Sequence, residues 1–187
     1  MDIQIYIQST PNPNALKFIL NVPVRTEGNA TYKSAEECHT NPLARHLFTI
    51  PHICEVYFFE NYITVSQDGQ GDWDLIEEQA KKIILENIKD HNPNFQAEPV
   101  VKKAALGVSD RNSPEIAKIE AILDQTIRPA LQMDGGDLRI IGLDENVLTV
   151  SYQGACGSCP SSAMGTLKAI ENLLREGYNP NLVVQLG

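Results

Sequence analysis

An aperiodic segment near the middle of the chain limits the folds that this sequence can adopt. Between His91 and Pro114 the sequence HNPNFQAEPVVKKAALGVSDRNSP is rich in turn-forming residues and has no sustained hydrophobic period. A structureless loop of this length is unusual inside one compact domain. The 187 residues are enough for two small domains. We therefore expect a first domain over residues 1–91, a linker over 92–113 and a second domain over 114–187.

The first domain is predicted to have an α+β fold, because its strands and helices do not alternate as βαβ units. Alternating apolar residues and turn signals predict strands over residues 3–7, 16–20, 54–59 and 62–66. Two helices are expected, over residues 43–48 and from residue 73 to about residue 89. Their predicted N-caps are Asn41, which precedes a proline, and Asp72.

The second domain is predicted to have the element order α-β-β-α-β. Ser113 followed by Pro114 is typical of the start of a helix. The sequence MDGGD ends that helix, because Gly135 or Gly136 can adopt a left-handed conformation at its exit. The later elements are expected to be strands over residues 138–143 and 147–152, a helix over 161–176 and a short last strand in NLVVQL.

The sequence GACGSCPSS at residues 154–162 places Cys156 and Cys159 between a predicted strand and a predicted helix. The free backbone N–H groups and the positive dipole at the start of a helix lower the pKa of nearby thiols and favour thiolate. Thiolate is the form that both metals and disulfide exchange require. The pair alone therefore leaves disulfide exchange, zinc binding and iron–sulfur binding open.

The number of available ligands favours a cluster that two copies share. A structural zinc site or an iron–sulfur cluster takes four ligands, but the second domain offers only Cys156 and Cys159 and contains no histidine. Two copies of this loop across a two-fold axis would supply four thiolates. The loop's small residues would let a cluster approach the backbone. A thioredoxin-type enzyme fits less well, because its thiols lie early in a βαβ pattern.

Four further features have simpler interpretations. Cys38 and Cys54 lie near three histidines in sequence, but the spacing matches no known ligand pattern, so we interpret both as ordinary buried or loop residues. The DGGD sequence that begins at Asp134 is interpreted as a glycine turn flanked by solvated carboxylates. The sequence TPNPN is expected to be a rigid turn between strands, and Trp73 is expected to anchor the start of a helix.

Charge and composition exclude several functional classes. There are 15 basic and 24 acidic residues, a formal net charge of −9, and both predicted domains are acidic. Neither domain therefore has the basic stripe that nucleic-acid binding requires. No apolar run reaches the length of a membrane helix. The start, MDIQIYIQST, is typical of a strand and not of a secretion or mitochondrial leader, so we expect a cytoplasmic protein.

Residues 119–176 closely resemble the NifU C-terminal-like domain of the Nfu family of iron–sulfur scaffold and carrier proteins. The matching residues are Ile127-Arg128-Pro129, Asp134-Gly135-Gly136-Asp137, the GACGSCPSS loop and Thr166-Leu167. The first domain resembles the N-terminal domain of two-domain Nfu proteins. There the matches are Thr10-Pro11-Asn12-Pro13-Asn14, Leu16-Lys17-Phe18, Asn41-Pro42-Leu43-Ala44, Leu47-Phe48 and Tyr62-Ile63-Thr64-Val65 before Trp73.

This resemblance implies a scaffold or carrier for iron–sulfur clusters, not an enzyme. Cys156 and Cys159 would be the metal and cluster ligands, holding a 4Fe–4S cluster between the subunits of a homodimer; a 2Fe–2S cluster also takes four thiolates. The implied partners are upstream cluster-assembly proteins and apo iron–sulfur client proteins, which the first domain is thought to help recognise. This chain has Asn41 where family members commonly have Ser, and Asn is an equally good helix cap.

Overall fold

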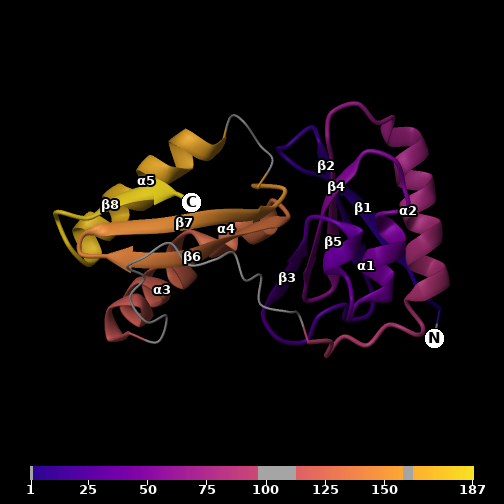
Figure 1. The fold of residues 1–187 in the computed structure, drawn as a ribbon, viewed down its shortest axis with the longest axis horizontal. Coiled ribbons are helices and arrows are strands. Elements are labelled where there is room, and N and C mark those ends of the chain that lie inside the picture. The colour runs from indigo at the N-terminus through magenta and orange to yellow at the C-terminus, as the bar shows by residue number, and fades with distance from the viewer. Residues whose placement is uncertain (1, 97–112, 158–161) are drawn as a thin grey trace. The chain divides into compact units, whose positions relative to one another are not determined.

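The chain forms two compact units, residues 1–99 and 100–187. The computed structural model describes residues 2–96, 113–157 and 162–187. Each unit combines helices with its own sheet (Figure 1), so the predicted α+β fold in two domains is confirmed. Among the described residues, no helix combines the length and apolar character that a transmembrane segment needs.

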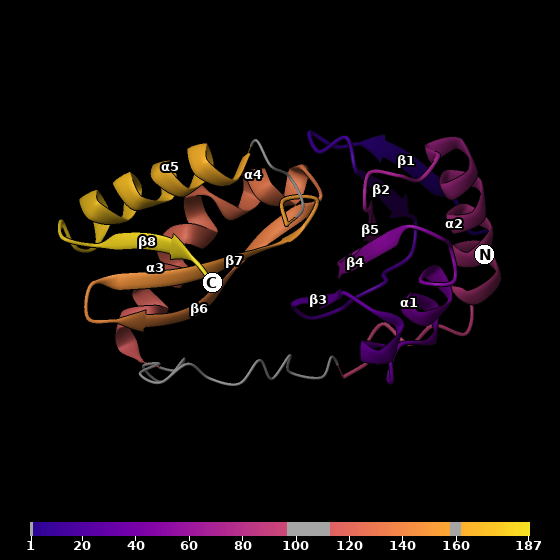
Figure 2. The ribbon, with the colours of Figure 1, turned by 45° about the horizontal axis from the view of Figure 1, so that its top comes forward.

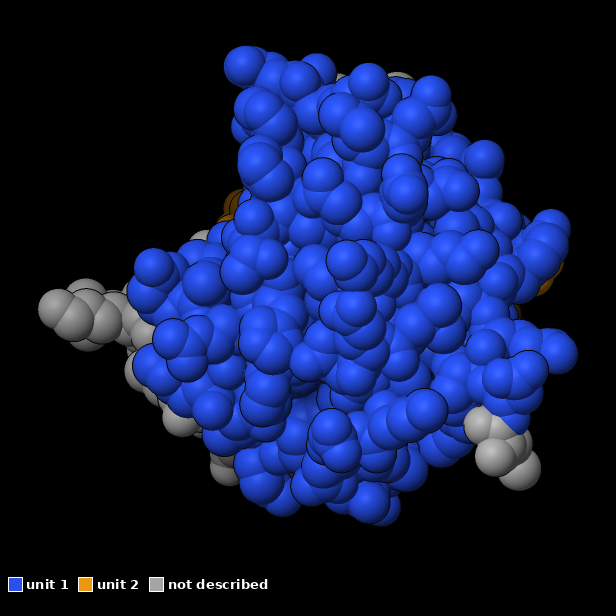
Figure 3. Space-filling view, turned by 90° about the vertical axis from the view of Figure 1, so that its right-hand side faces the viewer, with its two compact units in different colours: residues 1–99 blue, residues 100–187 orange. Residues whose placement is uncertain are grey.

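The first unit is built on a five-stranded antiparallel sheet in the order β1-β2-β5-β4-β3. Its strands are β1 (Ile5–Ser9), β2 (Ala15–Leu20), β3 (Asn29–Tyr32), β4 (Ile53–Phe59) and β5 (Tyr62–Gln67). Its helices are the 3₁₀ helix η1 (Ala35–Glu37), α1 (Pro42–Leu47) and α2 (Trp73–Asn87). Figure 3 shows this unit from the side on which α2 lies.

The core of the first unit lies between the sheet and the two α-helices. Alternate residues of the central strands, among them Phe18, Val56 and Ile63, belong to this core together with Ile84 and Ala80 of α2. This alternation is the period of a strand with one face on a core, and the spacing of Ala80 and Ile84 is that of a helix. The hydrophobic pattern therefore determines which face of each element packs inward.

The predicted helix caps of the first unit are confirmed. The Asn41 side chain accepts a hydrogen bond from the N–H of Ala44 at 3.1 Å, and Asp72 accepts one from the N–H of Asp74 at 3.0 Å. Strand β3 was not predicted. It is four residues long and lies in a polar stretch, where only Ala30 and Tyr32 face the core.

The TPNPN segment is a rigid turn, as predicted. The Thr10 hydroxyl donates to the carbonyls of Asn12 and Ala15, at 2.9 and 3.0 Å. The indole N–H of Trp73 donates to the carbonyl of Pro13 at 2.8 Å. Trp73 therefore ties the start of α2 to the β1–β2 turn, which confirms its role as an anchor.

The chain stays packed on the first core beyond the predicted end of the domain at residue 91. Phe95 is 4% exposed, and the Arg25 guanidinium lies 4.4 Å from the centre of its ring. The Thr40 hydroxyl donates to the carbonyl of Gln96 at 2.6 Å. Burial of an aromatic ring thus extends the packed chain to Gln96, and the rest of the predicted linker up to residue 112 lies outside the described residues.

The second unit has a three-stranded sheet in the order β6-β7-β8, in which β6 and β7 are antiparallel and β7 and β8 are parallel. Its elements are α3 (Pro114–Thr126), α4 (Arg128–Met133), β6 (Gly136–Asp144), β7 (Val147–Gly154), α5 (Ser162–Gly177) and β8 (Val183–Leu186). Leu123, Leu148 and Ile170 are among the fully buried residues of its separate core.

The predicted α-β-β-α-β order is confirmed with one difference, because the first helix is divided. Ser113 caps α3 by accepting from the N–H of Ile116 at 3.3 Å. The helix then ends at Thr126, and α4 begins at Arg128 with a proline in its first turn. Pro129 has no N–H and its ring crowds the preceding turn, so the helical hydrogen-bond pattern is interrupted there and the helix divides.

A carboxylate on α5 holds the short parallel strand β8 in place. Glu171 accepts from the N–H of Val184 at 3.1 Å and pairs with Lys168 at 2.7 Å and Arg175 at 3.0 Å. The hydrogen bond from Lys168 and that from the Val184 backbone lower the pKa of Glu171. Its ionised form is therefore more favourable in the folded chain than in the unfolded one.

We expect Glu171→Gln to lower the melting temperature of the second domain at neutral pH. Because the folded-state pKa is lowered, the contribution of Glu171 is present above the ordinary carboxyl pKa of about 4.3 and disappears as pH falls through the folded-state value. Thermal unfolding at pH 7 and pH 3 measures this, with Glu176→Gln on the exposed side of α5 as the control. An equal gap between wild type and Glu171→Gln at both pH values would contradict the assignment.

Candidate functional site

The thiol loop begins where β7 ends, at a glycine in a left-handed conformation. Gly154 has a φ of +62°. The N–H of Ala155 donates to the carbonyl of Gly135 at 3.1 Å, and the N–H of Gly157 donates back to Gly154 at 2.9 Å. Cys156, between them, is 9% exposed and packs with the core of the second unit. Backbone hydrogen bonds therefore fix the first half of the loop.

A second glycine turn faces Cys156 from the start of β6. Gly135 adopts the predicted left-handed conformation, with a φ of +82°, and Gly136 is paired in register with Gly154. A Cβ atom at Gly136 would lie 2.6 Å from the Cys156 sulfur and 2.7 Å from the carbonyl oxygen of Gln153. Only glycine fits there without displacing the thiol.

One arginine ties this turn to the helices. The Arg128 guanidinium bonds to Asp124 at 2.8 Å, pairs with Glu120 and donates to the carbonyl of Leu138 at 3.1 Å. Its Nε also lies 3.5 Å from a carboxylate oxygen of Asp137. Burial raises the pKa of Glu120, while the charge of Arg128 acts to lower it. Arg128 thereby joins α3 to the first residues of β6.

The expectation that both carboxylates of DGGD are solvated is wrong for Asp137. Asp134 is exposed, but Asp137 is 2% exposed and accepts a hydrogen bond from the N–H of Leu138 at 2.7 Å. A buried carboxylate is stable only when it is paired and hydrogen-bonded, and Arg128 supplies that pairing. Arg128 lies in the previous helix, so the local sequence around the turn gives no signal of this contact.

A buried tyrosine lies close to Cys156. Burial of Tyr152, which is 7% exposed, raises the pKa of its hydroxyl to about 12, and the neighbouring Cys156 acts in the same direction. The hydroxyl therefore stays neutral at physiological pH. It adds no negative charge beside a thiol whose metal-binding form is itself an anion.

Of the two predicted ligands, the structure places Cys156. Cys159 lies outside the described residues, so its position stays a prediction. Among the residues that the structure describes, no group of three or more His, Cys, Asp or Glu side chains is arranged to hold a metal ion. The described part of a single chain therefore does not supply a complete metal site.

The two cysteines of the first unit are ordinary buried or partly buried residues, as interpreted from the sequence. Burial raises the pKa of Cys38 to about 12, and its thiol donates to the carbonyl of Ser34 at 3.3 Å. Burial also raises the pKa of Cys54, whose thiol contacts the carbonyl of Ser66 at 3.5 Å. Neither environment favours the thiolate that a metal requires.

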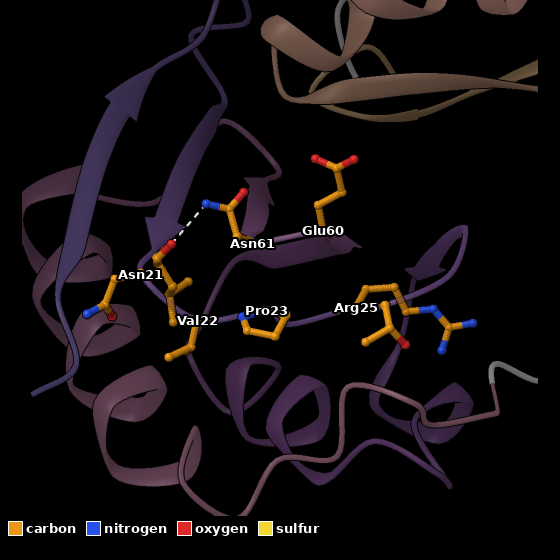
Figure 4. Close-up of a pocket in the computed structure, with 8 residues that line it drawn as sticks. Asn21, Val22, Pro23, Arg25, Glu60 and Asn61 are labelled. Atoms are coloured by element: carbon orange, nitrogen blue, oxygen red, sulfur yellow. Dashed lines mark hydrogen bonds between the residues drawn. The ribbon is translucent and has the colours of Figure 1, made fainter. Parts of the chain in front are cut away.

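The first unit has an open pocket of about 520 Å³ beside the β4–β5 turn (Figure 4). Some of its polar groups are used by the fold: the Asn61 side chain donates to the carbonyl of Leu20 at 2.9 Å, and the Glu60 carbonyl accepts from the N–H groups of Val24 and Arg25. No cysteine or histidine lines it. The pocket therefore lacks the thiol and imidazole ligands that zinc or an iron–sulfur cluster would need.

We expect Gly136→Ala to destabilise the second domain by about 1–3 kcal/mol, because the added methyl group overlaps the Cys156 sulfur and a backbone carbonyl. Urea unfolding measures the free energy, and labelling with a thiol reagent measures the exposure of Cys156, which should increase.

Gly165→Ala is the matched control for this substitution. A Cβ atom at Gly165 would meet no atom within 4 Å, so alanine there should stabilise α5 by about 0.5–1 kcal/mol through helix propensity. If both glycine variants shift stability in the same direction, the contact between Gly136 and Cys156 is not the cause.

Comparison with known families agrees with the division of the chain into two units. Residues 5–91 match the family described as "Scaffold protein Nfu/NifU N terminal", and residues 119–185 match the "NifU-like domain". A solved NifU-like protein from Saccharomyces cerevisiae is 20% identical, with a TM-score of 0.45, over 52% of this chain and 87% of that chain.

Curated relatives align along almost the whole chain. The mitochondrial NFU1 iron-sulfur cluster scaffold homolog of Drosophila grimshawi is 34% identical over 91% of this chain and 57% of its own length. A NifU-like protein of Schizosaccharomyces pombe is 32% identical over 98% of this chain and 73% of its own length. The chain thus spans a little over half of the length of the Drosophila relative and nearly three quarters of the length of the Schizosaccharomyces pombe relative. With both domains matched and the yeast relative covered this far, the chain belongs to the Nfu family of iron–sulfur cluster scaffold proteins.

Proposed function

We propose that this protein binds an iron–sulfur cluster through Cys156 and Cys159 and delivers it to apo iron–sulfur proteins, acting as a carrier and not as an enzyme. The observation that carries the proposal is the position of Cys156. Its thiol lies between a glycine turn at the end of β7 and another at the start of β6, in a chain that belongs to a scaffold family. The cluster is the cargo of the protein.

The residues around Cys156 suit a cluster better than a single small ion. Iron–sulfur clusters are held by cysteine thiolates, and Cys156 is the described thiol that packs against a glycine and lies between Ala155 and Gly157 in the chain. Gly136, Ala155 and Gly157 carry little or no side chain, so a bulky cluster can approach the main chain. By contrast, the thiols of Cys38 and Cys54 have raised pKa values and bond to backbone carbonyls.

The ligand count supports a homodimer. The second domain contributes two cysteines and no histidine, whereas a cluster takes four ligands. Two copies related by a two-fold axis would each give Cys156 and Cys159. We propose a 4Fe–4S cluster as the cargo, and a 2Fe–2S cluster would use the same four thiolates.

The proposed partners follow from this role. A carrier receives its cluster from upstream assembly proteins and passes it to apo client proteins, and neither nucleic acid nor membrane is proposed as a partner. The predicted cytoplasmic location stays part of the proposal; the word mitochondrial in the name of the fly relative describes that protein.

We expect anaerobic reconstitution with iron and sulfide to give, by native mass spectrometry, a dimer that carries four irons and four sulfides. Cys156→Ser or Cys159→Ser should abolish cluster binding while both domains stay folded, since each substitution removes two of four ligands per dimer. Cys54→Ser, outside the proposed site, is the control and should load normally.

Two results would contradict the proposal. Full iron retention by Cys156→Ser or Cys159→Ser would show that the ligands lie elsewhere. A metal-free monomer with a disulfide between the two cysteines would make them a redox couple, and the protein a thiol–disulfide oxidoreductase.

A chain that begins at Ser109 should still load a cluster and dimerise, because every proposed ligand lies after that residue and the second unit has its own core. Iron content and native mass of the truncated chain test this. Loss of binding on truncation would instead assign a ligand or an essential interface to the first domain.

A further inference from the structure

The short helix α4 has an apolar outer surface that the fold leaves exposed. Leu131 points into the core, but Pro129, Ala130 and Met133 are exposed, and Met133 is 73% exposed. Residues three or four positions apart in a helix lie on the same side, so these three form one surface, which we call the α4 face. None of the three carries a charge.

The α4 face leads directly into the site of Cys156. Met133 is followed by Asp134 and by Gly135, whose carbonyl accepts the hydrogen bond from Ala155 at 3.1 Å. The next residue, Gly136, packs on the Cys156 sulfur. Figure 2 shows α4 at the end of the sheet where β6 begins and β7 ends. A cluster that is bound to Cys156 and extends beyond it would therefore come close to Met133.

We propose that the α4 face is the protein contact between two copies of this chain when they share a cluster. This inference rests on the proposed function, because a shared cluster brings the Cys156 loops of both copies to opposite sides of one small body. The α4 face of each copy then borders the same space. Apolar side chains at this border exclude water from the cluster and add buried surface to the dimer.

Electrostatics opposes the association of two copies, and an apolar contact would help to offset this. From Glu115 to the end, the chain has five basic and nine acidic residues, a net charge of −4. Two such domains repel each other, and a cluster with four thiolates adds further negative charge. Burial of apolar surface does not depend on charge, so the α4 face can offset this repulsion.

The size of the α4 face indicates a dimer that depends on its cluster. Stable complexes bury about 800 Å² on each partner, far more than three side chains provide. The α4 face alone would therefore not hold two apo copies together, and on this inference the copies associate when the cluster joins them. The α4 face then determines how long the loaded dimer survives.

The test compares Met133→Glu with Met133→Leu in the full-length chain after anaerobic loading with iron and sulfide. Met133→Glu places two like charges across the proposed contact, which should shorten the lifetime of the loaded dimer at least about tenfold. Met133→Leu keeps the apolar contact and should stay close to wild type. Native mass spectrometry follows the dimer, and iron capture by a chelator follows the cluster.

Val183→Glu is the matched control in the same domain. Val183 is 43% exposed and pairs with Val147, at the opposite end of β7 from Gly154. Glutamate at this position adds the same charge far from the proposed contact and should leave the lifetime of the loaded dimer unchanged. Ala130→Glu, on the α4 face, repeats the test if Met133→Glu lowers the melting temperature.

The outcomes separate this inference from the proposed function. If the glutamate variants of the α4 face match Val183→Glu while Cys156→Ser loses the cluster, the α4 face is not the dimer contact, although the cluster site stands. If they slow transfer to an apo-ferredoxin without changing the lifetime of the dimer, the face binds clients and the inference is also overturned. If Cys156→Ser keeps its iron, the proposed function itself fails.

Discussion

The ion-pair network of Arg128 is the contact on which the candidate site depends. Its guanidinium is a rigid fork with donors in fixed directions, and it reaches Glu120 and Asp124 on α3 as well as Asp137 on β6. Because Asp137 is almost fully buried, its charge would be very unfavourable without this partner. The start of β6 is thereby fixed relative to α3, and that start determines where Gly136 lies.

Cys156 receives its position through this chain of contacts, and not from its own loop alone. Asp137 is fixed by Arg128, Gly136 precedes Asp137, and the missing side chain of Gly136 leaves room for the thiol. The backbone bond from Ala155 to Gly135 closes the arrangement. Rigid placement of this thiol suits the proposed cluster binding, because less conformational entropy would be lost on binding.

The sequence predicts the local features well and the contacts between distant elements poorly. Helix caps such as Asn41 and Ser113 can be predicted from the local sequence because the side chain bonds to a backbone group only three residues away. Strand β3 is not predicted because its polar sequence has no clear strand pattern, and pairing with β4 is what stabilises it. Likewise the spacing of Cys156 and Cys159 is enough to predict a pair of ligands, whereas the burial of Asp137 depends on Arg128 in a different element.

The acidity of the second domain and the small size of the α4 face would both keep a loaded dimer from becoming too stable. If two copies share a cluster, their carboxylates oppose the dimer at long range, while the cluster bonds and a small apolar contact hold it at short range. Such a balance suits cargo that must leave: once a client replaces one pair of thiolates, the remaining contact is too small to keep the copies together. A larger apolar interface would stabilise the loaded dimer more and would slow delivery, so the modest size of the exposed surface is itself consistent with a carrier.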